Sequence, residues 1–304
     1  MEKIKMMISL LVVVGIGVFS LASAKSILIV DTEIPPTPEK VPVFKFIPAP
    51  IEVKLSEDDA IGVAKAIKTE YRNATIARVF FQEDETWFIK LALPQKEIFV
   101  EVDAFSGELA DYNGLMSEYV NTSISADDGR KIATGFIGRY GGLPEDAVLT
   151  VDGEVTEWGA YGKRLRYSWI REVSGIKVMY PFNHITVFVN PGTKEVDGYK
   201  KTWTRLEVVK YENTTSAETA IASVEKKIRE ETDLLSRALK EPLKVKNIAL
   251  TLNAKNVVNE TYVPTWQLIV YETIEYNGIK EERAYANYYV DAITGDVIYK
   301  DPYR

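Results

Sequence analysis

The sequence predicts an α+β fold built from three tandem units, each with one helix packed on an antiparallel sheet. A helix signal that begins at a serine occurs three times, at residues 56–71, 125–140 and 216–228. Each helix is followed by stretches rich in β-branched and aromatic residues that alternate as half-buried strands do. Each unit then closes with a hairpin, and two of these hairpins carry nearly the same turn sequence. A helix and a sheet of this kind bury their apolar faces by packing in two layers.

Each expected helix has a start signal and one apolar face. Ser56, Ser125 and Ser216 stand at the N-cap positions, where a hydroxyl accepts a free backbone N–H. An acid follows each serine two residues later (Asp58, Asp127 and Glu218) and suits the positive end of the helix dipole. The expected strands cover residues 76–81, 86–93, 97–102 and 108–112, then 164–170, and then 265–273 and 284–290.

The closing hairpins read VDAFSGE at residues 102–108, VNPGTKE at 189–195 and VDAITGD at 290–296. We expect Asp103 and Asp291 to accept hydrogen bonds from turn amides, and Gly107 and Gly295 to adopt a left-handed conformation. In the second hairpin Asn190 replaces the aspartate and a lysine stands where glycine is usual, so a different turn is expected there. These structural roles explain the residues without any chemistry.

With these residues the chain resembles the PepSY-type domain, a helix on a cystatin-like sheet. The third unit, with Val263-Pro264-Thr265-Trp266 before its hairpin, is similar to the propeptides of thermolysin-like metalloproteases. The second unit resembles the tandem YcdB/YcdC repeats of envelope proteins. The resemblance implies a protein that inhibits, chaperones or regulates an extracellular peptidase, or that assists envelope assembly.

Residues 1–24 are expected to be a signal peptide or an N-terminal membrane anchor. Lys3 and Lys5 precede an apolar stretch that ends at Ala22-Ser23-Ala24, a small-residue cleavage signature. Whether this segment is cleaved or retained as an anchor, the rest of the chain is expected outside the cytoplasm, secreted or at the cell surface. Contact with a membrane is expected only through this segment, if it is not cleaved.

Residues 25–54 are expected to be a proline-rich linker, because six of the 13 prolines fall within residues 35–50. The alternative is an ordered arm that packs Val43, Phe44 and Phe46 on the first unit. The three units then cover residues 55–118, 119–208 (diverged) and 209–304.

Composition excludes several classes of function. The net charge of −7 gives no reason to expect nucleic acid as a partner. The chain has no cysteine and one histidine, so thiolate chemistry and multi-histidine metal sites are excluded, and no cofactor is expected. Three Gln, one His and many charged residues fit a thermophile. Four sequons are candidate glycosylation sites at a surface: Asn73, Asn121, Asn213 and Asn259.

No residue carries a catalytic signature. His184 lies in a strand-like segment without a nucleophile motif, and no pair of the 44 acidic residues stands out. The candidate recognition surface is the group Tyr285, Tyr288, Tyr289 and Tyr299 in the last hairpin, since tyrosine gives a large contact area. Cross-strand pairs that stabilise the sheet are the alternative.

The sequence therefore predicts a non-enzymatic, exported module that binds a protein at the cell surface, with a peptidase as the partner that the resemblance implies. A structural or scaffolding component of the cell surface is the alternative, and an unrecognised carboxylate-based hydrolase is the third.

Overall fold

The structure is a computed structural model. It describes residues 26–47, 55–82, 85–114, 124–157, 162–179, 183–234, 239, 241–253, 255–258 and 261–303. The expected signal segment, residues 1–24, lies outside this range. Within the described residues, no helix is both long and apolar enough to cross a membrane.

The three helices begin where the serines indicate. They are α2 (Glu57–Ala66), α3 (Ala126–Arg139) and α4 (Ala217–Leu234). Ser56, Ser125 and Ser216 each accept a hydrogen bond from the backbone N–H three residues later, at 3.1–3.2 Å. The first helix is shorter than expected, because a 3-10 helix, η1 (Thr69–Asn73), replaces its last part.

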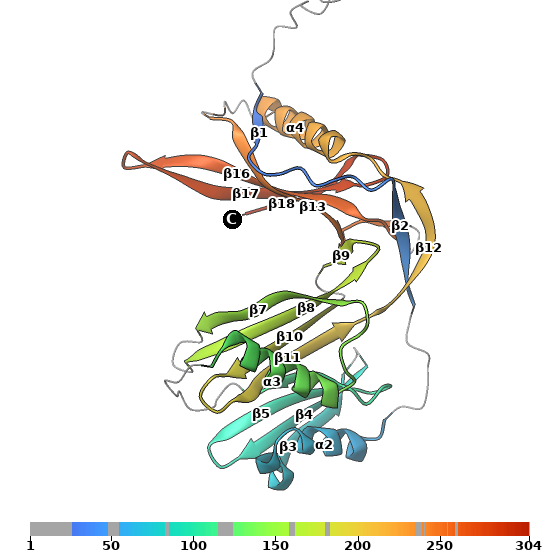
Figure 1. The fold of residues 1–304 in the computed structure, drawn as a ribbon, viewed down its shortest axis with the longest axis vertical. Helices are drawn as coiled ribbons and strands as arrows, with labels where there is room; N and C mark the ends of the chain where they lie inside the picture. The colour runs from blue at the N-terminus through green and yellow to red at the C-terminus, as the bar shows by residue number, and fades with distance from the viewer. Residues whose placement is uncertain are drawn as a thin grey trace, which may run out of the picture.

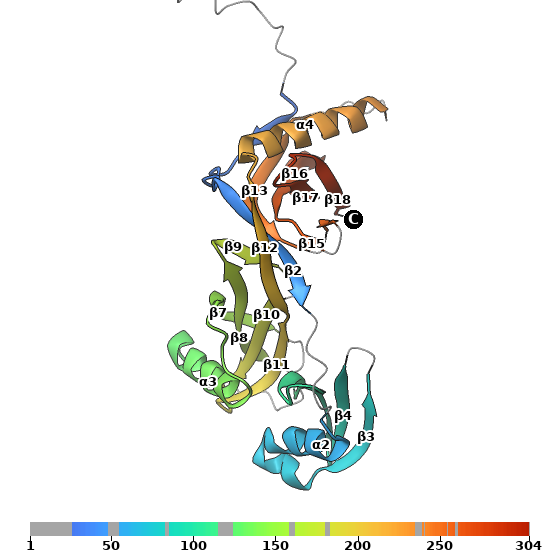
Figure 2. The ribbon, with the colours of Figure 1, turned by 90° about the vertical axis from the view of Figure 1, so that its right-hand side faces the viewer.

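Strands make up most of the rest of the chain (Figures 1 and 2). Up to α3 they are β1 (Leu28–Val30), β2 (Lys40–Ile47), β3 (Thr75–Phe81), β4 (Thr86–Leu93), β5 (Lys96–Asp103) and β6 (Leu109–Asn113). Between α3 and α4 they are β7 (Ala147–Glu157), β8 (Lys163–Val173), β9 (Ile176–Val178), β10 (Asn183–Asn190), β11 (Glu195–Trp203) and β12 (Arg205–Asn213). After α4 come β13 (Leu243–Leu252), β14 (Val257–Val258), β15 (Thr261–Tyr262), β16 (Thr265–Tyr276), β17 (Ile279–Asp291) and β18 (Val297–Pro302).

The predicted fold class, three separate helix-on-sheet units with purely antiparallel sheets, is wrong. The described part of the chain is mostly β, and 14 strands join in one mixed sheet with the order β18-β17-β16-β13-β9-β8-β10-β11-β6-β5-β4-β3, to which β1 and β7 are added. Strand β6 pairs with β11, and β13 pairs in parallel with both β9 and β1. Alternation along a strand indicates which face is buried, but it does not indicate which strand lies alongside. The pattern therefore could not show that the expected sheets are continuous.

One core underlies both α2 and α3. Tyr112 of β6, Phe136 of α3 and Tyr199 of β11 meet in it, with ring centroids 5.4–6.2 Å from the Phe136 ring. A second core under α4 contains Trp266, Leu268 and Tyr288. The residues expected in the first and second units thus share their apolar interior, while the third has its own.

The proline-rich segment is not a free spacer. Residues 40–47 form β2, which pairs antiparallel with β12 and β15 in a separate four-stranded sheet. Figure 2 shows β2 and β12 side by side between the two cores. Val43 and Phe44 are buried, and Phe44 packs with Ile176 and Leu252. The chain forms an ordered arm, as the alternative proposed, but the arm packs on β12 and not on the first unit.

A buried ion pair ties β8 to β11 at the junction of the first two units. Arg164 and Asp197 are almost fully inaccessible, and Arg164 Nε lies 2.8 Å from Asp197 Oδ2. Lys68, from the segment after α2, reaches the same carboxylate at 3.4 Å and Glu195 at 2.8 Å. A buried charge is tolerated only with a partner, so these contacts depend on each other.

We expect Arg164→Leu to lower the free energy of unfolding by about 3–5 kcal/mol, because it leaves Asp197 buried without its main partner. Arg164→Leu combined with Asp197→Leu should cost less than Arg164→Leu alone. Urea denaturation of the wild type, both single variants and the double variant measures this. If the double variant is less stable than both single variants, the expected free-energy cost of leaving one buried charge without its partner is contradicted.

Candidate functional site

The three closing turns share one backbone geometry. The N–H of Gly107, Lys194 and Gly295 donates to the carbonyl four residues earlier, at 2.9–3.0 Å, and all three have a positive φ, between 57° and 78°. Asp103, Asn190 and Asp291 each accept two turn amides through Oδ1. The different turn expected around Asn190 is therefore not found. Lys194 takes the left-handed conformation that glycine takes in the other two turns.

These turns lead to a stability prediction. A side chain in the left-handed region costs about 1–2 kcal/mol, so Gly107→Ala and Gly295→Ala should both destabilise the protein. Gly295→Ala should cost more, because its Cβ would lie 3.2 Å from Thr219 Cγ2, whereas that of Gly107 would lie 3.7 Å from Leu55 Cδ1. Lys194→Gly should raise the melting temperature. Thermal unfolding of the three variants tests the order, and a destabilised Lys194→Gly would contradict it.

The four tyrosines of the last hairpin do not form one surface. Tyr288 is fully buried beneath α4, and Tyr285 packs partly against the same core. Tyr289 and Tyr299 pair across β17 and β18, with ring centroids 5.8 Å apart. Since neighbouring residues of a strand point to opposite faces, the sheet itself separates the group. Only the Tyr289–Tyr299 pair remains as a surface feature, and it matches the cross-strand alternative.

Two of the four sequons fall on described residues. Asn73 ends η1 and Asn213 ends β12, and both are exposed. Asn121 and Asn259 lie outside the described residues. Glycosylation at any of them stays a prediction.

His184 lies on the sheet face opposite α3, between Ile170 and Thr202 in the strand register. Burial, followed by the charge of Lys200, lowers its pKa, so the ring is neutral near pH 7. Its ladder neighbours offer no acid and nucleophile in the arrangement that a serine triad requires. Within the described residues, no group of three or more His, Asp or Glu side chains is placed to hold a metal ion.

Asp111 lies on the same face of the sheet as His184 and has a strongly raised pKa. Burial, and then the charge of Glu101 directly opposite on β5, raise its pKa to about 6. Lys200 lies 3.9 Å away and offsets only part of this effect. Because the folded pKa is higher than the unfolded one, the native state binds more protons between about pH 4 and 6, and stability falls as the pH rises through that window.

We expect Asp111→Asn to be more stable than the wild type at pH 8 and to lose this advantage below about pH 4, where Asp111 is protonated in both states. Urea denaturation of both proteins at several pH values isolates the contribution of Asp111. An equal stability difference at pH 4 and pH 8 would show that it does not come from the ionisation of Asp111.

Strand β3 presents the open edge at one end of the large sheet. No described strand pairs with its outer side. Phe80 and Phe81 are 36% and 39% exposed. The ring of Phe80 lies 4.9 Å from that of Phe88, which lies 6.0 Å from Phe99. The Arg78 guanidinium sits 4.7 Å from the Phe80 ring. We call Arg78, Phe80, Phe88 and Phe99 the aromatic row. The row runs from the edge strand β3 across β4 to β5.

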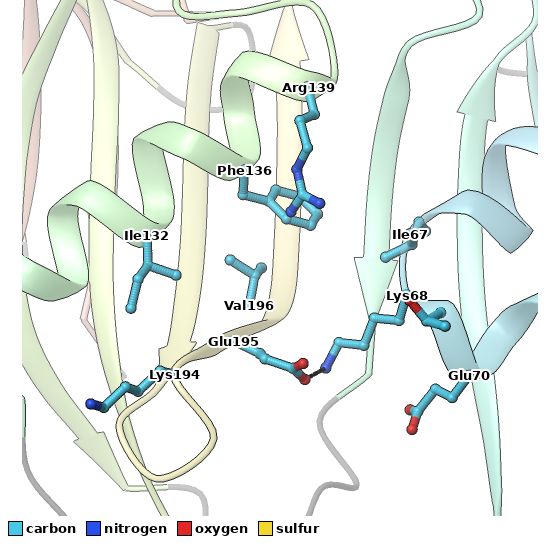
Figure 3. A pocket seen from close by; sticks show the side chains of 10 residues that line it. Ile67, Lys68, Glu70, Ile132, Phe136, Arg139, Lys194, Glu195 and Val196 are labelled. Atoms are coloured by element: carbon cyan, nitrogen blue, oxygen red, sulfur yellow. Dashed lines mark hydrogen bonds and ion pairs between the residues drawn. The ribbon is translucent and has the colours of Figure 1, made fainter.

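A cavity of about 570 Å³ lies between η1 and α3. Figure 3 shows Ile132 and Phe136 of α3 and Val196 of β11 on one side, with Ile67 on the other. The Lys68–Glu195 ion pair crosses it, and the Arg139 guanidinium lies 5.3 Å from the Phe136 ring. The cavity thus combines an apolar wall with charged groups at its mouth.

Comparisons with known proteins are consistent with the fold and give no function. No family model matches the chain, and no curated protein matches it. A solved structure of an uncharacterized protein from Eubacterium rectale is similar, with a TM-score of 0.52 and 14% identity over 92% of this chain and 92% of that one. The YpeB C-terminal domain of Bacillus megaterium is similar at a TM-score of 0.46 and 15% identity, over 83% of this chain and 100% of that one. The Eubacterium likeness shows a shared fold, and the lower score of the YpeB domain carries no further conclusion.

Sequence reasoning missed a repeated contact that fixes two of the helices. Trp87 Nε1 donates to Leu55 O and Trp266 Nε1 donates to Thr215 O, both at 2.9 Å, and each acceptor directly precedes an N-cap serine. The dipeptide Thr-Trp at residues 86–87 and 265–266 is a signal shared by the two contacts, although the same dipeptide also occurs at residues 202–203. The open edge of β3 gave no such signal, since it depends on which strands pair.

Proposed function

We propose that this protein is an exported, non-enzymatic module that binds a partner protein by adding an extended segment of the partner to strand β3. The observation that carries the proposal is the open β3 edge next to the aromatic row. Strand addition at an exposed sheet edge is a common mode of peptide recognition, in which backbone hydrogen bonds give affinity and side chains give specificity.

The backbone of β3 directs alternate pairs of N–H and C=O groups away from β4. Gln82 N donates to Thr86 O at 2.8 Å, so these residues form a hydrogen-bonded pair with β4. In an antiparallel ladder such pairs alternate with non-bonded ones, and Phe80–Phe88 is therefore the next bonded pair. The N–H and C=O groups of Val79 consequently point away from β4, toward the edge where a partner strand would meet them.

The side chains define the chemistry of that partner. On one face of β3 the added strand would lie beside Arg78 and Phe80, which favours an acidic and an aromatic residue in alternation. On the other face Val79 and Phe81 are only partly covered, so an apolar residue there would bury them further. The preferred segment alternates apolar residues with an acid and an aromatic.

Two other edge strands, β7 and β18, carry features that discourage strand addition. Strand β7 has two register shifts, and its acids Asp152 and Glu154 are ion-paired with arginines. Strand β18 ends in Lys300-Asp301-Pro302. Charges, bulges and proline are the usual means of protecting an edge. Strand β3 has one bulge and a single charged residue, Arg78.

The setting of the proposal comes from the sequence. The basic and apolar N-terminal segment supports export, and the resemblance of the hairpin motifs to PepSY-type domains and to protease propeptides supports a peptidase at the cell surface as the partner. In this reading the β3 edge would hold an extended segment of that peptidase.

We expect Val79→Pro to abolish partner binding with little loss of stability, because proline removes an N–H that faces the open edge. Phe80→Pro should instead destabilise the protein by about 1–3 kcal/mol, because it removes a hydrogen bond to β4. Val209→Pro, on the exposed edge strand β12, is the matched control and should bind as the wild type does. Binding is measured by capturing secreted and envelope proteins of the native host on immobilised protein, with quantification by mass spectrometry.

A peptidase assay on the same secreted fraction tests the nature of the partner. Wild type and Val209→Pro should reduce peptidase activity, and Val79→Pro should not. If Val79→Pro folds normally and retains the same bound proteins as the wild type, the β3 edge is not the binding site. Turnover of a substrate by the purified protein would contradict the non-enzymatic reading.

A further inference from the structure

The hairpin of β16 and β17 ends in an exposed apolar tip. Strand β13 pairs with β16 only as far as Tyr271, which lies opposite Lys244. The hairpin continues beyond this point. It closes at Asn277 and Gly278, with φ of 53° and 77°. Tyr276 and Ile279 face each other across the turn and are 74% and 63% exposed, the highest values among the large apolar side chains described. Figure 1 shows the hairpin projecting from the body of the sheet.

Alternation defines the composition of the tip face. Residues two positions apart on a strand point to the same face. Tyr276 and Ile279 therefore share their face with the cross-strand pair Ile274 and Glu281. Neighbouring acids are neutralised: Glu272 by Arg283 at 2.7 Å and Glu282 by Lys244 at 2.6 Å. Within the described residues Glu281 forms no ion pair. We call Ile274, Tyr276, Ile279 and Glu281 the tip face: three apolar side chains and one acid.

The cavity between η1 and α3 has the complementary composition. Ile132, Phe136 and Val196 form its apolar wall, and Arg139 lies over the Phe136 ring at its mouth (Figure 3). The two acids that line the cavity are already paired, Glu195 with Lys68 at 2.8 Å and Glu70 with Lys96 at 2.7 Å. In the described part of the chain Arg139 has no carboxylate partner. An apolar group that carries one carboxylate suits this site.

The tip face cannot reach the cavity of its own chain. The hairpin belongs to the C-terminal part of the sheet, whereas the cavity lies beside α2 and α3, at the other end of the long axis (Figure 1). A tip that fills such a cavity must therefore come from another copy. We propose that the tip face of one copy docks in the cavity between η1 and α3 of a second copy, with Glu281 beside Arg139. Since the two surfaces differ, every copy offers one tip and one cavity, and the contact builds either a closed ring of copies or an open chain.

Sedimentation velocity of the full chain, from micromolar to submillimolar concentration, tests the proposal. The wild type should show a mass that rises with concentration. Tyr276→Ser combined with Ile279→Ser should remain monomeric with an unchanged melting temperature, because both side chains are exposed. Tyr211→Ser removes another exposed tyrosine, 55% exposed, from β12 and should associate as the wild type does.

A charge exchange tests the proposed pair directly. Glu281→Lys and Arg139→Glu should each weaken association by about 10-fold or more, and the two variants mixed with each other should recover it, since each then offers the complementary charge. A wild type that stays monomeric over the whole range overturns the proposal. It is equally overturned by tip variants that associate normally, or by single charge variants whose mixture shows no recovery. None of these outcomes bears on the β3 edge, which the Val79→Pro variant tests separately.

Discussion

The pairing of backbone groups at sheet edges is the constraint on which the rest of this structure depends. A helix packed on a short antiparallel sheet leaves the N–H and C=O groups of its outer strands without partners, and such groups are costly to bury and prone to pair with other strands. Here β6 pairs with β11, and β9 pairs with β13, so that strands from distant parts of the chain complete each other. The edge of β3, with one bulge and one charged residue, is an edge at which this process stops.

The pairing of β6 with β11 also brings charged and aromatic side chains together. Phe136 packs against Tyr112 and Tyr199, which come from the two strands that pair. Asp197, fully buried on β11, meets Arg164 from β8 and Lys68 from the segment after α2. The junction is therefore held by an apolar contact on one side and by a buried charge cluster on the other. A cavity lies between η1 and α3, and the Lys68–Glu195 ion pair crosses it.

The two surfaces proposed for binding are the β3 edge and the tip of the β16–β17 hairpin. The β3 edge offers backbone hydrogen bonds with aromatic side chains beside them, and the tip of the β16–β17 hairpin offers apolar side chains on a two-stranded arm. The one histidine of the sequence, His184, has a lowered pKa and lies between Ile170 and Thr202 in the strand register. The two proposed surfaces need different structures. Binding at the β3 edge needs an outer strand that pairs on one side only, and binding at the tip needs a turn that holds two strands beyond the sheet. The Asn277-Gly278 turn supplies the second.

The sequence by itself determined the local structure: the starts of α2, α3 and α4 at serines, the alternation of the strands, and the aspartate or asparagine that accepts turn amides. These features depend on residues a few positions apart, so a pattern in the chain is sufficient to predict them. It did not reveal the left-handed Lys194, since the backbone hydrogen bond of that turn holds a residue that prefers other conformations. The separation of Tyr288 from Tyr289 follows from alternation, but only the position of α4 decided which of the two is buried. Which strands pair, where the sheet ends, and hence the β3 edge and the cavity beside α3, were decided by tertiary structure alone. Strand pairing is made through backbone groups that are the same in every residue, so the side-chain pattern records which face is buried and not which partner lies alongside.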